Sequence, residues 1–146
     1  MVAGFARARQ ICEHEQPDEP GGTPLDDVTQ MTSSQVGRWY QYFKGMLAYA
    51  IVEAGEADLL YATAKSNHEL AKKISMARQS DISDKTPAWK VEAIIADDQK
   101  YMKARVELQK KQAYKEAMHV QVKSLEHKAE LFSREITRRE QEAEQS

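Results

Sequence analysis

The chain has 146 residues, of which 41% are hydrophobic and 30% charged, and its formal net charge at pH 7 is -2. This length suits one domain, and a single cysteine excludes a disulfide framework. The small net charge gives no global sign of a nucleic-acid binder, and no apolar run approaches the ~20 residues of a membrane span.

The composition favours long helices. Only six Gly and four Pro are present, and three of the prolines fall between residues 17 and 24. The remainder is dominated by Ala, Glu, Gln, Lys, Arg, Leu and Met, which are good helix formers. The lone cysteine fits a reducing compartment, and the N-terminus lacks the apolar core of a signal peptide. We therefore expect an all-α, soluble, cytoplasmic protein.

Residues 1–32 predict a flexible acidic leader. Apolar residues at positions 2, 5 and 11 suggest a short amphipathic helix over 2–12. Between Gln10 and Gly37 there are six acidic residues and no Lys or Arg. Residues 13–32 also hold the Pro and Gly cluster, and they bury too little apolar surface to offset the entropy of ordering. Two roles stay open for this leader: a solvated spacer, or a DNA mimic that occupies a basic patch.

A first long helix is predicted from residue 33 to about Gln79. Thr32, Ser33 and Ser34 offer N-cap oxygens, and no proline follows until Pro87. Apolar side chains then recur at helical spacing, first bulky and aromatic and later mostly Ala, which allows a close helix neighbour.

A polar break over residues 80–87 (SDISDKTP) predicts a turn, with Pro87 opening a second helix that runs without interruption to about Glu140. Three pairs, Glu107–Lys111, Glu130–Arg134 and Glu135–Arg139, have the favourable i,i+4 order. Six apolar residues follow a 4-3-4-3-4 spacing that indicates a coiled-coil seam: Met118, Val122, Leu125, Ala129, Phe132 and Ile136. The sequence predicts a long antiparallel, coiled-coil-like helical hairpin over 33–146 with its turn near 80–86.

This hairpin is expected to self-associate. At ~1.5 Å per residue the two helices would be roughly 70 and 80 Å long, so the pair has little interior. Uncovered apolar surface usually marks an interaction site. The residues predicted to form the homo-oligomer interface are Trp39, Tyr40, Phe43, Leu47, Met118, Val122, Leu125, Phe132 and Ile136.

No catalytic constellation is recognisable in the sequence. The four histidines lie apart, Cys12 with His14 makes a poor metal site, and no glycine-rich phosphate loop is present. Asp97–Asp98 is an acidic pair of the kind that is usually solvated or that stabilises a helix dipole. We expect a protein that is not an enzyme and that has no metal or cofactor.

Two basic clusters are the more informative feature. Cations contact phosphates and aromatic rings stack on unpaired bases, so such clusters suggest single-stranded DNA. An ordinary solvated helix face is the alternative. The candidate residues are Lys65, Lys72, Lys73 and Arg78 in the first helix and Lys100, Tyr101, Lys103, Arg105, Lys110, Lys111, Tyr114 and Lys115 in the second.

The order of these features resembles the phage recombination mediators of the UvsY type. The similar segments are RWYQYFKGMLAYAIVEA (38–54), AKSNHELAKKISMARQ (64–79) and, after the break, WKVEAIIADDQKYM (89–102). The resemblance covers roughly 34–138. It implies an oligomer in the cytoplasm of an infected cell that binds single-stranded DNA and helps load a RecA-like recombinase onto strands covered by single-strand-binding protein.

One element departs from the family. A Lys-Ala-Arg element associated with DNA contact lies near the end of the first helix there, whereas Lys103-Ala104-Arg105 lies in the second helix here.

Two other interpretations remain. The regular 118–136 seam would suit a structural or assembly protein, such as a phage scaffold or adaptor, and a helical hairpin would suit a secreted effector, although the Trp-x-Gly turn of such effectors is missing.

Overall fold

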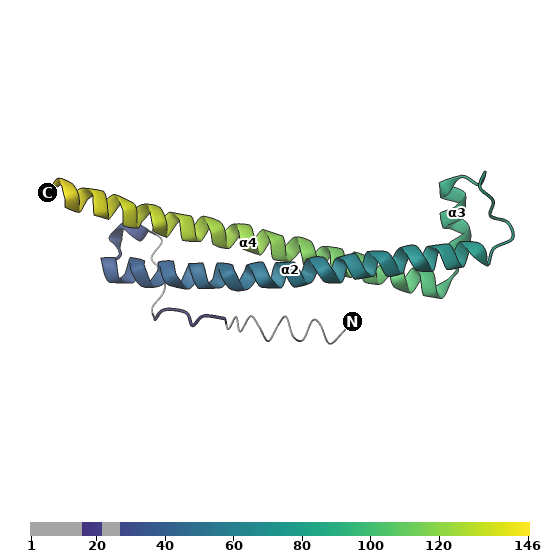
Figure 1. Cartoon of the computed structure of the whole chain (residues 1–146), viewed down its shortest axis with the longest axis horizontal. Helices are drawn as coiled ribbons and strands as arrows, with labels where there is room; N and C mark the ends of the chain where they lie inside the picture. The colour runs from purple at the N-terminus through teal and green to yellow at the C-terminus, as the bar shows by residue number, and fades with distance from the viewer. Residues whose placement is uncertain (1–15, 22–26) are drawn as a thin grey trace. The chain divides into compact units, whose positions relative to one another are not determined.

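The computed structural model describes residues 16–21 and 27–146, and all its regular elements there are helical (Figure 1). They are η1 (Val28–Gln30), α2 (Ser33–Ala77), α3 (Ala88–Ile95) and α4 (Gln99–Gln145). The all-α prediction is confirmed for these residues, and the short helix predicted over 2–12 lies outside them. Contacts divide the chain into unit 1, residues 1–53 and 120–146, and unit 2, residues 54–119. Both α2 and α4 contribute to each unit.

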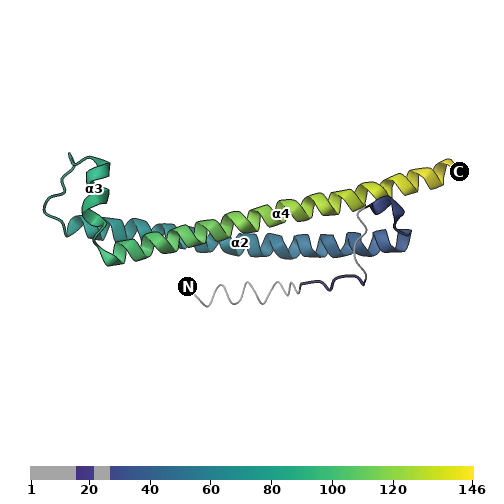
Figure 2. The same ribbon diagram turned by 180° about the vertical axis from the view of Figure 1, so that it is seen from behind.

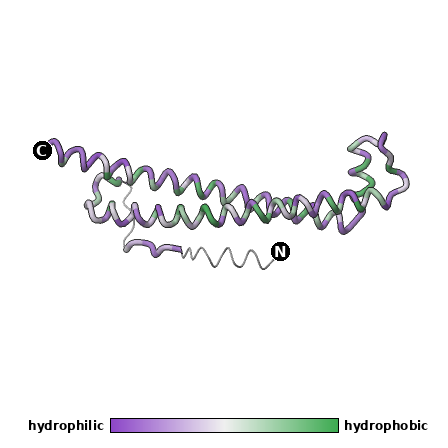
Figure 3. The backbone as a smooth tube through the Cα atoms, in the orientation of Figure 1, coloured by the Kyte–Doolittle hydropathy of each residue, from purple (hydrophilic) through white to green (hydrophobic). Residues whose placement is uncertain are grey.

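In unit 1 the first half of α2 lies antiparallel to the second half of α4 (Figures 1 and 2). The Phe43 and Phe132 rings meet at a centroid distance of 5.4 Å, and Trp39 stacks on Phe43 at 5.7 Å. Apolar residues recur along both helices (Figure 3). The buried cluster consists of Met31, Val36, Trp39, Phe43, Met46, Ala50, Leu125, Ala129 and Phe132.

The start of α2 is held by a reciprocal cap. The Gln35 N–H donates to Thr32 Oγ1 at 3.2 Å, and the Thr32 N–H donates to Gln35 Oε1 at 2.9 Å. Met31 and Val36, which flank this capping box, are both buried in the unit 1 cluster, as in a hydrophobic staple. Residues 27–32, which were predicted to belong to the leader, are therefore structured, because Met31 is only 4% exposed and Asp27 caps η1.

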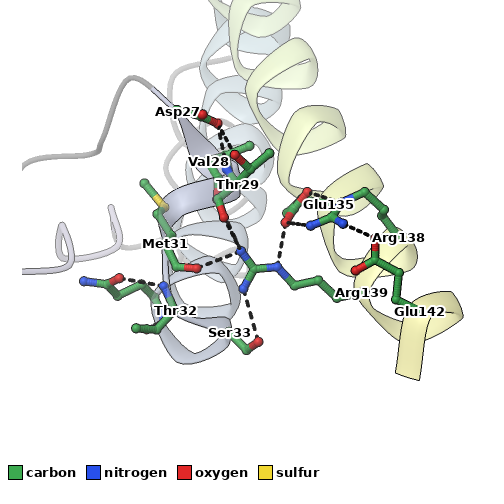
Figure 4. A network of polar contacts seen from close by, with 11 residues as sticks. Asp27, Val28, Thr29, Met31, Thr32, Ser33, Glu135, Arg138, Arg139 and Glu142 are labelled. Atoms are coloured by element: carbon green, nitrogen blue, oxygen red, sulfur yellow. Dashed lines mark hydrogen bonds and ion pairs between the residues drawn. The ribbon is translucent and has the colours of Figure 1, made fainter. Parts of the chain in front are cut away.

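An arginine of α4 holds the chain that enters α2 (Figure 4). The Arg139 guanidinium donates to the carbonyls of Val28, Thr29 and Met31 and to the Ser33 hydroxyl, the shortest at 2.7 Å to Met31. Glu135 is 5% exposed and accepts from Arg138 at 2.7 Å and Arg139 at 2.6 Å. These two hydrogen bonds lower the pKa of Glu135 to about 2. All three predicted i,i+4 ion pairs are present, which confirms them.

In unit 2 the second half of α2 lies antiparallel to the first half of α4. His119 Nε2 is 2.7 Å from Asp58 Oδ1, and the Lys115 ammonium lies 4.5 Å from the centre of the Tyr61 ring. Ala54, Ala57 and Ala64 are buried. The small residues of α2 thus permit a close neighbour, as their spacing predicted.

The second helix is not continuous, and that prediction is wrong. Asp98 Oδ1 accepts from the backbone N–H groups of Lys100 at 2.9 Å and Tyr101 at 3.3 Å, so it caps a new helix after the break at residues 96–98. The break allows Val91 and Ile95 of α3 to pack with Tyr101 in a second buried cluster. A continuous helix would leave this small apolar face uncovered. Its burial therefore stabilises the broken helix.

Candidate nucleic-acid interface

Unit 2 contains both predicted basic clusters. The one in α2 and the one at the start of α4 belong to the same unit, where the His68 and Tyr101 rings lie 5.3 Å apart. Residues 54–119 include 12 Lys and Arg against 10 Asp and Glu, while the whole chain is net negative. The weak positive charge of the protein is therefore concentrated in this unit.

Seven of the predicted cations are exposed, and all are available to a ligand in solution. They are Lys65, Lys73, Arg78, Lys100, Lys103, Arg105 and Lys110. Four of them follow one another in the first three turns of α4, where Glu107 is the single intervening acid. These seven cations, the exposed basic set, are the side chains of unit 2 that could contact the phosphates of a flexible strand.

The other three predicted cations already have partners in unit 2. Lys72 Nζ donates to Glu92 Oε1 at 2.7 Å, and Lys111 Nζ lies 3.5 Å from Glu107 Oε1. Lys115 covers the Tyr61 ring. Lys72 joins α2 to α3 and Lys115 joins α4 to α2, while Lys111 pairs within α4, so these side chains are less available for a phosphate than the exposed basic set.

Tyr101 is not a stacking platform, and its assignment as one is wrong. Its side chain is 1% exposed, and its hydroxyl donates to Glu92 Oε2 at 2.7 Å. Burial, followed by this hydrogen bond, raises the pKa of Tyr101, while the Lys72 and Tyr101 hydrogen bonds lower the pKa of Glu92. The ring fills the space between α3 and its neighbours, which the local sequence around residue 101 does not reveal.

Two other aromatic rings remain accessible in unit 2. Tyr114 is 41% exposed, so its ring is accessible for the stacking role predicted for it. Trp89, at the first turn of α3, is 74% exposed and was not among the predicted residues. It is flanked by the exposed Lys85 and Lys90. The signal that could have found it is a tryptophan two residues after Pro87, in the stretch between Lys85 and Lys90.

The residues predicted to form the oligomer interface mostly belong to the chain's own core. The expectation that their apolar side chains would be left uncovered is therefore wrong. Four of its nine residues, Trp39, Phe43, Leu125 and Phe132, are buried within unit 1. Four more, Tyr40, Leu47, Val122 and Ile136, are half-buried against the same cluster, and Met118 is half-buried in unit 2. Helix α2 covers the 4-3 seam of α4, and a second copy is not needed for that purpose.

Other functional groups can be checked only where the structure describes the chain. There, no three His, Cys, Asp or Glu side chains gather in a way that could hold a metal ion. Likewise, no helix over residues 27–146 is both long and apolar enough to cross a bilayer. Cys12 and His14 lie outside the described residues.

Comparison with protein-family models, with curated proteins and with solved structures finds no match to this chain.

Proposed function

We propose that this protein binds single-stranded DNA and mediates recombination by helping a RecA-like recombinase load onto strands covered by single-strand-binding protein. The observation that carries this proposal is the exposed basic set of unit 2, with Tyr114 and Trp89 accessible in the same unit. The mechanism is binding without bond-making. Cations hold the phosphate backbone and the rings stack on bases, which leaves the strand open to the recombinase.

The working form in this proposal is a homo-oligomer of long antiparallel helical hairpins. A single basic set of seven exposed cations is a modest binding site. Repetition in an oligomer multiplies its affinity when one strand reaches several copies. Single-strand binding should weaken with salt, with a slope of log Kd against log salt of at most about 5 per basic set, from ~0.7 per neutralised phosphate.

The test is a titration of a labelled oligo-dT strand, followed by fluorescence anisotropy, with the double variant Lys103→Glu/Arg105→Glu. Both side chains are exposed, so the fold should persist and the circular dichroism spectrum should match the parent. Affinity should fall at least tenfold. The matched control is Lys44→Glu, an exposed lysine of unit 1, which should bind nearly as the parent does. No binding at low salt, or equal loss in both variants, would refute the proposal.

A second candidate is a structural or assembly protein with no nucleic-acid role. The observation that favours it is the number of large apolar side chains left exposed, among them Leu59, Leu70, Val120 and Leu131 at 52–67%. Light scattering coupled to size-exclusion chromatography, with and without poly-dT, separates the two candidates. Assemblies that are the same size with and without the strand would favour the assembly protein.

A further inference from the structure

Helix α4 carries a second apolar seam on the side that faces away from α2. Its covered seam occupies heptad positions a and d, which include Val122, Leu125 and Phe132 in unit 1. Counted in the same heptads, five of the eight opposite positions c and f from 106 to 131 are apolar: Val106, Ala113, Ala117, Val120 and Leu131. Positions c and f normally face water and are polar in a two-helix pair.

These residues are uncovered in the structure. Val106 is 45% exposed, Val120 67% and Leu131 53%, and both alanines are exposed as well. The stripe also has definite ends, because the next c and f positions on either side are the charged Lys103 and Arg134. A face that is apolar at five of its eight 3-4-spaced positions, and that ends in charges on both sides, is one that a partner helix can cover.

We propose that two copies of this chain form an antiparallel dimer through the exposed seams of their α4 helices. This interface does not rest on DNA binding. In the antiparallel register the apolar side chains of the seam meet apolar or small ones from the second copy: Val106 meets Leu131, Ala113 meets Ser124, and Ala117 meets Val120. Val120 lies against Ala117 at the centre of this register, and Val106 and Leu131 lie towards its two ends.

The charges beside the seam select this orientation. In the antiparallel register Glu116 faces Lys123 of the second copy, and Glu107 faces Lys128 of the second copy, so both flanks carry attractive pairs. In a parallel, in-register pair Lys123 would instead face Lys128 of the second copy, which is a repulsive pair. Flanking charges of this kind set partner orientation in coiled coils.

The polar residues within the seam also favour the antiparallel orientation. Lys110 and His127, two of the three polar residues in the seam, are exposed in the single chain, and the dimer would withdraw Lys110 from the exposed basic set. They would face each other in the antiparallel register, whereas a parallel pair would bring Lys110 against Lys110 of the second copy. A lysine at a single seam position lowers stability but specifies register.

The first experiment is sedimentation velocity over micromolar to millimolar protein, with the Val120→Glu variant and the control Thr137→Glu, an exposed residue beyond the end of the seam. The parent and the control should form dimers, and Val120→Glu should stay monomeric with an unchanged circular dichroism spectrum. A monomeric parent at every concentration, or Val120→Glu assembling as the parent does, would overturn the proposal.

A charge exchange tests the orientation. Glu116→Lys and Lys123→Glu should each raise the dimer Kd on the order of tenfold, because the exchange makes two symmetric repulsive pairs. The double variant Glu116→Lys/Lys123→Glu should recover the parent Kd. A spin label at residue 109, in a Cys12→Ser background, should report a separation of roughly 30 Å, from 19 residues at ~1.5 Å each. A separation below about 15 Å would indicate parallel helices and refute the antiparallel register.

Discussion

The adjacent residues Leu131 and Phe132 give the sharpest test of which side of α4 belongs to the chain's own core. Phe132 is 5% exposed and packs on Phe43, whereas Leu131 is 53% exposed. Truncation of a buried phenylalanine to alanine costs about 3–5 kcal/mol, from lost transfer free energy and the cavity left behind. Truncation of an exposed leucine away from the core changes stability by only about 0.5 kcal/mol.

Phe132→Ala should therefore lower the melting temperature by roughly 6–20 °C, since 1 kcal/mol shifts it by about 2–4 °C in a chain of this length. Leu131→Ala should change it by roughly 2 °C or less at low concentration. The measurement is thermal unfolding followed by far-UV circular dichroism, in dilute protein so that self-association does not contribute.

The conservative variant Phe132→Leu serves as the control, because it keeps most of the apolar volume and should cost less than about 1.5 kcal/mol. Equal destabilisation by Leu131→Ala and Phe132→Ala would refute the assignment of the core side. A loss below about 1 kcal/mol for Phe132→Ala would do the same.

Three further predictions follow from polar contacts. Asp98→Ala removes the N-cap of α4 and should lower the melting temperature by roughly 2–4 °C, while Asp98→Asn, which still accepts from the backbone, should retain most of it. Tyr101→Phe removes the hydroxyl donor to Glu92 and should cost about 1 kcal/mol in chemical denaturation; no loss would mean that Lys72 alone satisfies Glu92. The pKa of Glu135 falls from its ordinary 4.5 to about 2 on folding, so the stability it contributes is present above pH 4.5 and is lost as the pH falls to about 2. Glu135→Gln should flatten the melting temperature over that range, and an unchanged pH profile would contradict the role of this carboxylate.

The parts of the fold that the sequence predicted are those decided by local chemistry. The Thr32 cap, the break after residue 79 and the three i,i+4 ion pairs depend on residues within four positions of one another. α2 ends at Ala77, two residues before the predicted end. Such signals act through backbone hydrogen bonds and helix propensity, so they can be identified without knowledge of the tertiary packing.

The parts that the sequence did not predict depend on contacts between distant segments. Asp98 is one acid in a stretch without Pro or Gly, and its capping role becomes favourable because α3 can then bury Val91 and Ile95 against Tyr101. The buried Ser75 hydroxyl falls outside hydrogen-bond geometry to any described atom. It nevertheless lies close enough to Asp98 to be the first cause of the lowered pKa of the Asp98 carboxyl, ahead of the Tyr101 and Lys100 N–H groups. Helical periodicity alone carries no information about such neighbours.

The oligomer interface shows a different limit. The 4-3 spacing from Met118 to Ile136 correctly indicated a covered face, but a heptad does not identify the chain that covers it. Here α2 of the same molecule covers most of it. The opposite seam is hard to recognise in the sequence because two of its five apolar residues are alanine and because Lys110, Ser124 and His127 interrupt it. It becomes visible only once the structure assigns the first seam to α2.

The two proposals together predict how affinity depends on strand length. In the antiparallel α4 pair, the Lys103 side chains of the two copies would lie roughly 45 Å apart along the axis, from 31 residues at ~1.5 Å each. A strand of about 8 nucleotides is of the size that one basic set can hold, whereas one of about 40 nucleotides could reach both. The longer strand should therefore bind the parent 10- to 100-fold more tightly. Val120→Glu should remove this gain and leave the affinity for the short strand unchanged, because residue 120 lies outside the exposed basic set. Anisotropy titrations of both strands with both proteins measure the four constants. A gain that persists in Val120→Glu would mean that the basic sets are joined by some surface other than the exposed seam of α4.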